Sequence, residues 1–221
     1  MHTVLIFSGK GGSSKTTLTR ELAVAASLAG RSVAIADLDP QAGLTGWFSR
    51  REAETPSLVK IPTGYDLTPL AKAGIDELII DLPPGVPPYV DKLIQQADVV
   101  LVPCRPSPDD LTAAASVVPK LARHPQWAFV MVQTLHRSRL SDGALRQLAS
   151  LGRVAPVSLG SRQDYPLAAI EGAAAVEFAS TKSADEVTQL RAYVNKMVGL
   201  EDGKKASRRS RRHGDKQGES G

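Results

Sequence analysis

Residues 9–17 read Gly9-Lys10-Gly11-Gly12-Ser13-Ser14-Lys15-Thr16-Thr17. This stretch lies between an apolar run typical of a β-strand, residues 3–8, and a helical pattern over residues 16–29. Strand, glycine-rich loop, Lys-Thr and helix in this order are the pattern of a phosphate-binding P-loop. The consensus G-x-x-x-x-G-K-[ST] is met except at Ser14, which replaces the second glycine.

The residue types in this loop suit a bound nucleotide. Glycines let the backbone curl so that successive N–H groups face phosphate oxygens, and the following helix adds its positive N-terminal end. Lys15 is expected to reach the β- and γ-phosphates, and the Thr16 hydroxyl to ligate Mg²⁺. The predicted nucleotide contacts of the loop are Gly9, Lys10, Gly11, Gly12, Ser13, Ser14, Lys15, Thr16 and Thr17.

Two further acidic motifs follow apolar runs. Residues 32–36 predict a buried strand that ends in Asp37-Leu38-Asp39-Pro40-Gln41, and residues 78–80 lead into Asp81-Leu82-Pro83-Pro84-Gly85. A carboxylate at the end of a strand is held rigidly, as hydrolysis beside a γ-phosphate requires. The second motif is typical of a Walker B strand.

Together these motifs resemble the ParA/MinD family of deviant Walker A P-loop ATPases, and most of all the short plasmid-partition ParA proteins. The shared patterns are K-G-G-x-x-K-[ST], D-x-D-P-Q and D-x-P-P-G, and the resemblance covers about residues 1–200. It implies an ATPase with slow basal turnover, with ATP and Mg²⁺ as cofactors, and an ATP-dependent homodimer. In this reading Lys10 reaches the partner's nucleotide, Lys15 binds phosphate and Asp39 positions the attacking water, so these three are the expected catalytic residues. Thr16, Asp37 and Asp81 would support Mg²⁺.

The resemblance also suggests where the adenine lies. Residues 103–110 look like the family's P-x-x-P-S-x-x-D loop, which places Pro103 near the base. Gln133 falls where the family usually has an Asn that reads the adenine edge, and its amide can make the same pair of hydrogen bonds.

Alternating predicted strands and helices favour an α/β fold, a doubly wound and mostly parallel sheet with helices on both faces. Helices are expected over residues 87–97, 109–123, 141–151 (with Ser141 as its cap), 165–170 and 183–198, strands over 98–102, 127–133 and 154–159, and loop with short elements over 50–74. We expect one domain, residues 1–200, followed by a disordered basic tail, residues 201–221.

Bulk properties narrow the class of protein. The chain has 221 residues, one cysteine (Cys104) and no apolar stretch of transmembrane length. A single cysteine excludes an intrachain disulfide or a cysteine-pair metal site within one chain. The first strand begins at residue 3, so we expect no signal peptide, no preceding DNA-reading domain and a cytoplasmic protein.

The charge pattern indicates a surface partner. From residue 204 onward there are seven basic and two acidic residues, whereas the formal net charge of the whole chain is only +4. Such a tail suits nonspecific double-stranded DNA better than membrane insertion, because it carries no large apolar side chain. We therefore expect nucleoid association, with DNA contacts from Arg162, Lys182, Arg191, Lys196, Arg208, Arg209, Arg211 and Arg212; a plain solubilising tail is the alternative.

The resemblance leads to one principal function: a nucleotide switch that positions a cargo along DNA, with hydrolysis stimulated by a ParB-like adaptor or centromere-binding protein. The short form favours plasmid or chromosome segregation. A carboxysome, chemoreceptor cluster or conjugation machinery remains an alternative cargo, and MinD-like action a related one. A dethiobiotin-synthetase-like metabolic enzyme and a catalytically silent nucleotide-binding module are the competing classes.

Overall fold

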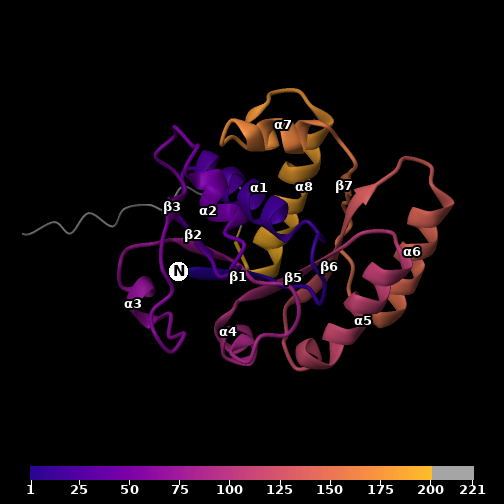
Figure 1. Cartoon of the computed structure of the whole chain (residues 1–221), viewed down its shortest axis with the longest axis horizontal. Coiled ribbons are helices and arrows are strands. Elements are labelled where there is room, and N and C mark those ends of the chain that lie inside the picture. Colours follow the sequence, from indigo (N-terminus) through magenta and orange to yellow (C-terminus); the bar gives the residue numbers. More distant parts are fainter. Residues whose placement is uncertain (201–221) are drawn as a thin grey trace, which may run out of the picture.

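The computed structural model describes residues 1–200, which form one parallel sheet covered by helices on both faces (Figure 1). The strands follow the order β3-β2-β4-β1-β5-β6-β7, and neighbouring strands of this sheet are parallel. Their bounds are β1 His2–Ile6, β2 Val33–Asp37, β3 Ser57–Leu58, β4 Glu77–Asp81, β5 Val99–Cys104, β6 Trp127–Thr134 and β7 Leu159–Gly160. The predicted doubly wound α/β class is confirmed.

Helices cover the two faces of the sheet in two groups. One buried core joins the sheet to α1 and α8, and the other joins it to α4, α5 and α6. The helices are α1 Lys15–Leu28, α2 Gly43–Phe48, α3 Thr68–Ala71, α4 Val90–Gln96, α5 Pro108–Leu121, α6 Arg139–Leu151, α7 Asp164–Ile170 and α8 Lys182–Met197, with a 3₁₀ turn η1 at Ala175–Glu177. None of the helices described between residues 1 and 200 is both long and apolar enough to cross a membrane.

The register of the central strands brings the predicted acidic residues together. β1, β2 and β4 begin and end in step, so that Asp37 pairs with Asp81, and Asp81 also pairs with Ile6 at the end of β1. Because these strands are parallel, their carboxyl ends share one edge of the sheet. The P-loop, which follows β1, therefore begins beside both carboxylates.

A buried ion pair fastens the last helix to the sheet. Arg191 of α8 is 5% exposed, and its guanidinium makes two hydrogen bonds to the Glu77 carboxylate at the start of β4. Arg31 forms a second ion pair with Glu77, at 3.1 Å. The expected DNA contact of Arg191 is therefore corrected: this side chain is turned into the protein and serves the fold.

The last strand differs from the prediction for residues 154–159. Val154 makes only an isolated bridge to Phe129, and pairing with β6 resumes at Leu159, with a register shift between Val132 and Thr134. Pro156 lies between them and has no N–H to donate to the ladder, so the extended segment is interrupted there. The predicted helix over 141–151 begins earlier, at Arg139, because the cap is Ser138 and not Ser141; the Ser138 hydroxyl accepts from the Ser141 N–H.

Candidate nucleotide-binding site

The glycine-rich loop runs from the end of β1 to the start of α1. It packs closely on α5, since a Cβ atom at Gly9 would lie 2.8 Å from the Ala113 carbonyl oxygen. Inside the loop, the hydroxyl oxygens of Ser8 and Ser13 are 2.6 Å apart, and the Ser8 hydroxyl donates to the Lys10 carbonyl at 2.7 Å. These contacts hold the loop in a curled form before any anion binds.

Ser14 adopts the backbone conformation that the consensus assigns to glycine. Its φ is 67°, in the left-handed region that is costly for a residue with a side chain. Gln133, at the end of β6, also has a positive φ, of 52°, and its side-chain amide donates to the Ser14 hydroxyl at 2.9 Å. The serine is therefore accommodated in the conformation of the missing glycine, with its hydroxyl bonded to the residue predicted to read the base.

The three motifs converge at the carboxyl edge of the sheet. The Thr16 hydroxyl donates to Asp81 at 2.6 Å. Asp37 accepts from the backbone N–H and hydroxyl of Thr45, at 2.8 and 2.9 Å, and from the Asp39 N–H at 3.1 Å. The Asp39 carboxylate accepts from the Gln41 N–H at 2.9 Å, which fixes its turn after β2.

Burial shifts the pKa values of two charged groups at this edge, Asp81 and Lys15. Asp81 is fully buried, one of its carboxylate oxygens has no hydrogen-bond partner, and burial raises its pKa to about 7 despite the opposing hydrogen bond from Thr16. Lys15 is 6% exposed, and burial lowers its pKa although Asp81 and Asp39 oppose that shift. A cation beside Asp81 would pair with the carboxylate oxygen that has no hydrogen-bond partner and would favour the ionised carboxylate. The site therefore fits Mg²⁺.

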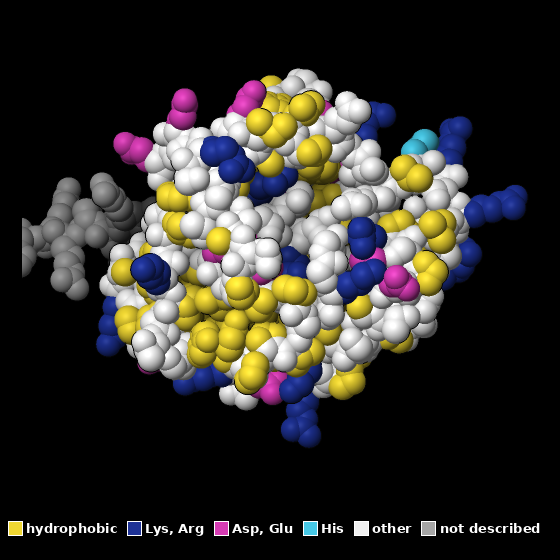
Figure 2. Space-filling model, viewed as in Figure 1, with side chains coloured by type: hydrophobic (Ala, Val, Ile, Leu, Met, Phe, Trp, Pro, Cys, Tyr) yellow, Lys and Arg dark blue, Asp and Glu magenta, His cyan; other side chains and the backbone are white. Residues whose placement is uncertain are grey.

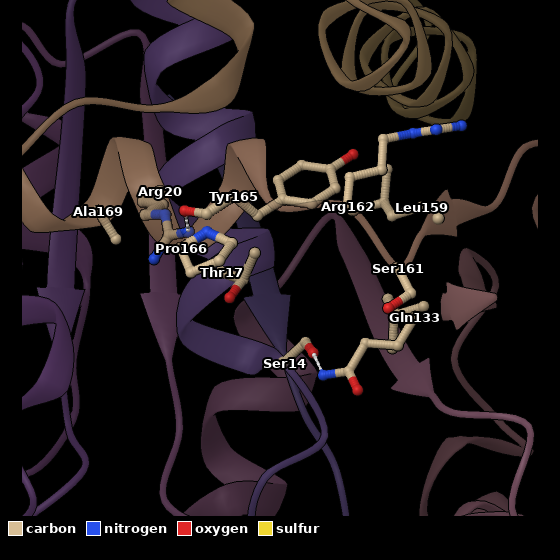
Figure 3. Close-up of a pocket in the computed structure, with 12 residues that line it drawn as sticks. Ser14, Thr17, Arg20, Gln133, Leu159, Ser161, Arg162, Tyr165, Pro166 and Ala169 are labelled. Atoms are coloured by element: carbon tan, nitrogen blue, oxygen red, sulfur yellow. Dashed lines mark hydrogen bonds between the residues drawn. The ribbon is translucent and has the colours of Figure 1, made fainter. Parts of the chain in front are cut away.

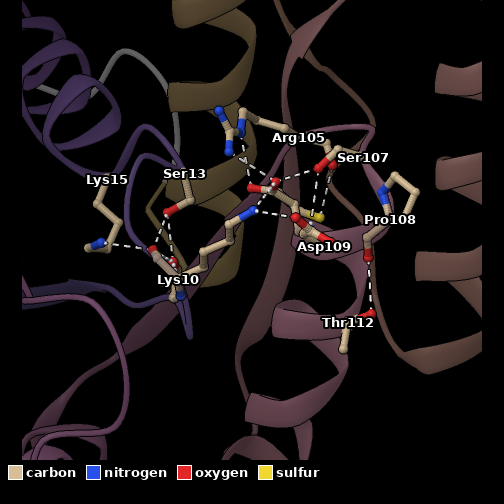
Figure 4. A network of polar contacts seen from close by, with 11 residues as sticks. Lys10, Ser13, Lys15, Arg105, Ser107, Pro108, Asp109 and Thr112 are labelled. Atoms are coloured by element: carbon tan, nitrogen blue, oxygen red, sulfur yellow. Dashed lines mark hydrogen bonds and ion pairs between the residues drawn. The ribbon is translucent and has the colours of Figure 1, made fainter.

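Lys10 lies in a different environment from Lys15 (Figure 4). Its ammonium group is 3.4 Å from Asp109 and 3.3 Å from Asp110, at the start of α5. Arg105 also binds Asp110, through two hydrogen bonds of 3.0 Å. Lys15 instead donates to the Lys10 carbonyl at 3.4 Å, so the two lysine side chains diverge from the same loop.

A cavity of about 440 Å³ opens beside the P-loop (Figure 3). Three segments line it: the start of α1, the end of β6, and the segment from β7 into α7. The residues are Ser14, Thr17, Arg20, Val132, Gln133, Leu159, Gly160, Ser161, Arg162, Tyr165, Pro166 and Ala169. The size and the mixture of apolar and polar groups are typical of a small-molecule site.

The other predicted site residues differ in burial and in their contacts. Pro103 lies within β5, buried and paired with Val130, and it does not line the cavity, so its predicted contact with the base is corrected. Arg162 is bound to Glu186 of α8. Lys182 and Lys196 are exposed on α8. The predicted tail contacts Arg208, Arg209, Arg211 and Arg212 lie outside the described residues.

Sequence reasoning missed several residues that shape the cavity. Arg20, 6% exposed, reaches from α1 to the Tyr165 carbonyl with a hydrogen bond of 2.5 Å. Tyr165 and Ser161 come from the segment after β7. No motif in the sequence marks these positions, because the contacts join segments that are more than a hundred residues apart.

The comparisons with known proteins agree with this geometry. Residues 4–200 match the model of the CobQ/CobB/MinD/ParA nucleotide binding domain. The chain is similar to a "Maintenance of carboxysome distribution protein A" from Halothiobacillus neapolitanus, 28% identical over 207 residues, which are 85% of this chain and 94% of that protein.

Two solved structures share the fold. The McdA–ATP complex from Cyanothece matches with a TM-score of 0.67 and 20% identity, over 91% of this chain and 97% of that one. The septum site-determining protein MinD with Mg-ADP from Pyrococcus horikoshii matches with a TM-score of 0.70 and 18% identity, over 90% and 97%. At these identities the structures support the fold alone, whereas the match over residues 4–200 shows the family. The chain belongs to the ParA/MinD family of P-loop ATPases.

Proposed function

We propose that this protein is an ATP-dependent switch that positions a large intracellular cargo, with Mg²⁺-ATP bound between the P-loop and the ends of β2 and β4. The observation that carries the proposal is the hydrogen bond from Thr16 to the buried Asp81 beside Lys15. The other carboxylate oxygen of Asp81 has no hydrogen-bond partner. Within residues 1–200 no three His, Cys, Asp or Glu side chains form a metal site by themselves. Phosphate oxygens of the nucleotide would therefore complete the Mg²⁺ coordination.

The cavity gives the nucleoside a place next to the phosphates. Ser14 and Thr17 belong both to the P-loop segment and to the cavity lining. Gln133 at its edge would hydrogen-bond the base, as an amide can both donate and accept. The solved neighbours include ATP and Mg-ADP complexes, which supports adenine nucleotides as ligands.

Hydrolysis needs a group that orients water at the γ-phosphate. Asp39 follows β2 at the same edge as Lys15 and Asp81, and Asp37 holds the turn through the Asp39 N–H. We assign Asp39 to the attacking water and Lys15 to the phosphate charge. Thr16, Asp81 and Asp37 would hold Mg²⁺, which would supply electrophilic stabilisation of the transferring phosphate.

The environment of Lys10 supports a role outside its own nucleotide site. Its ammonium group faces Asp109 and Asp110 and diverges from Lys15. Figure 2 shows apolar side chains gathered on the surface beside α3 and α4. Val86, in the loop after β4, is 47% exposed. We propose that two copies meet here around ATP, with Lys10 crossing to the partner's nucleotide.

The proposed track is nonspecific double-stranded DNA. Lys182 and Lys196 remain available on α8, whereas Arg162 and Arg191 are engaged with Glu186 and Glu77. The basic tail from residue 204 supplies further phosphate contacts in this proposal. The carboxysome relative favours a cargo other than a plasmid, so we propose cargo positioning in general, stimulated by an adaptor protein of ParB type.

The test is binding to nonspecific duplex DNA with no nucleotide, with ADP, and with ATP plus Mg²⁺. Asp39→Ala is used to prevent turnover. We expect binding with ATP only, and weaker binding at higher salt. Equal binding in all three states would mean that the basic residues act as a tether without a switch, and absence of binding would contradict DNA as the track.

A further inference from the structure

One short segment separates two cavities. Gly160, Ser161 and Arg162 line the 440 Å³ cavity beside the P-loop and also a second cavity, of about 430 Å³, toward α6. Because residues 160–162 have a cavity on each side, few apolar side chains pack against them. Their position must depend on polar contacts, one of which is the hydrogen bond from the Ser161 N–H to the Thr134 carbonyl at 2.9 Å.

Glu186 of α8 supplies most of the other contacts. Its carboxylate accepts from the Gly160 N–H at 3.0 Å, from the Arg162 Nε at 3.1 Å and from the Tyr165 hydroxyl at 3.1 Å. It also accepts from a terminal nitrogen of Arg162. Gly160 and Arg162 of this segment and Tyr165 of α7 thus converge on one side chain, which is 16% exposed.

The contacts also determine where Arg162 lies. Its guanidinium is paired with Glu186 of α8 and points away from Ser14 and Gln133 (Figure 3). The guanidinium packs closely on Gly160, since a Cβ atom there would lie 3.2 Å from the Arg162 Nε. The Tyr165 ring, 6% exposed, faces the cavity while its hydroxyl is held by Glu186.

We infer that Glu186 is a positioning residue for nucleoside binding, which holds the wall formed by residues 160–162 and Tyr165 in the shape that receives the base and ribose. The inference rests on the proposed placement of the nucleoside in the 440 Å³ cavity. Every group that meets Glu186 is a donor, and only a carboxylate accepts from all of them. A glutamine at this position would place an NH₂ group against other donors.

The chain offers a matched control. Glu177 in η1 also accepts from an arginine, Arg51 at 3.0 and 3.1 Å, and from a backbone N–H, that of Ala174 at 2.7 Å. Its carboxylate is likewise partly buried, at 26% exposure, but it lines neither cavity. Glu186→Gln and Glu177→Gln therefore remove the same chemistry at two places.

The experiment measures the affinity of the full chain for Mg-ADP and for Mg-pyrophosphate, with the thermal midpoint of each variant. Glu186→Gln should weaken ADP binding by about tenfold, because several donors lose their acceptor. Pyrophosphate, which reaches only the P-loop, should bind within about twofold of wild type in both variants, and Glu177→Gln should keep the wild-type affinity for ADP. Tyr165→Phe, which keeps the ring, should cause a smaller loss of ADP affinity.

Several results would overturn the inference. ADP binding at wild-type strength in a folded Glu186→Gln variant would show that the wall does not need the carboxylate. Equal losses for ADP and pyrophosphate, or equal losses in the two glutamine variants, would show general destabilisation. A wild-type chain that binds pyrophosphate but not ADP would contradict the nucleoside cavity, and one that binds neither would contradict the proposed function itself.

Discussion

At the scale of single residues, the two lysines of the P-loop differ in burial and in partners. Lys15 is buried beside the carboxylates of the sheet edge, and Lys10 is bound to the acidic start of α5. Lys15→Ala should therefore weaken ATP binding by at least about ten- to a hundredfold, the size expected for a lost charge-assisted contact to phosphate. Lys10→Ala should leave the ATP affinity of a single subunit close to wild type. Calorimetric titration of both variants distinguishes them, and equal losses would contradict separate roles.

Asp81 makes the stability of the nucleotide-free protein depend on pH. Its pKa rises from 3.8 to about 7 on folding, mainly through burial, so the folded state holds an extra proton between these values. The Asp81 contribution to the free energy of unfolding therefore falls as the pH rises through this window, by up to about 1.4 kcal/mol per pH unit. Urea unfolding between pH 4 and 8 should show that Asp81→Asn removes this contribution. An unchanged pH profile in the variant would refute the assignment.

The residue-level predictions from sequence depended on local motifs. Thr16, Asp37 and Asp81 are close together because each ends or begins an element at one edge of a parallel sheet, which the spacing of the motifs anticipates. Pro103 and Arg191 were misplaced, because which side of an element a residue faces depends on distant partners such as Val130 and Glu77.

At the scale of elements, α8 combines an anchored side with an exposed side. Arg191→Ala should destabilise the protein by about 3 kcal/mol, because it leaves part of the Glu77 charge buried without its partner. Lys196→Ala, on the exposed side of the same helix, should change stability by less than about 0.5 kcal/mol. Chemical unfolding measures both. Similar values for the two variants would contradict the structural role of the Arg191–Glu77 pair.

The order of strands and helices could largely be predicted, because apolar runs and turn residues are local signals. The short elements could not. α2 begins after Ala42, which has a φ of 51°, and β7 contains only Leu159 and Gly160. Their existence depends on tertiary contacts, such as the hydrogen bond from the Trp47 indole to the Ala173 carbonyl at 2.9 Å, and the same is true of the cavity wall.

At the scale of the whole molecule, charge is concentrated in the sequence after residue 204, with seven basic and two acidic residues. Deleting residues 204–221 should weaken binding to nonspecific DNA and reduce its dependence on salt, since fewer counterions would be released. Titrations at several salt concentrations measure both quantities. Unchanged affinity and salt dependence would assign DNA binding to the domain, with Lys182 and Lys196 as the residues to change next.

We propose that ATP joins two copies of this chain. The most direct measurement is the mass in solution of Asp39→Ala without nucleotide, with Mg-ADP and with Mg-ATP, beside the double variant Lys10→Ala/Asp39→Ala. We expect the mass to double with ATP only, and only when Lys10 is present. The same mass in all three states, or a dimer that forms equally well without Lys10, would contradict this proposal.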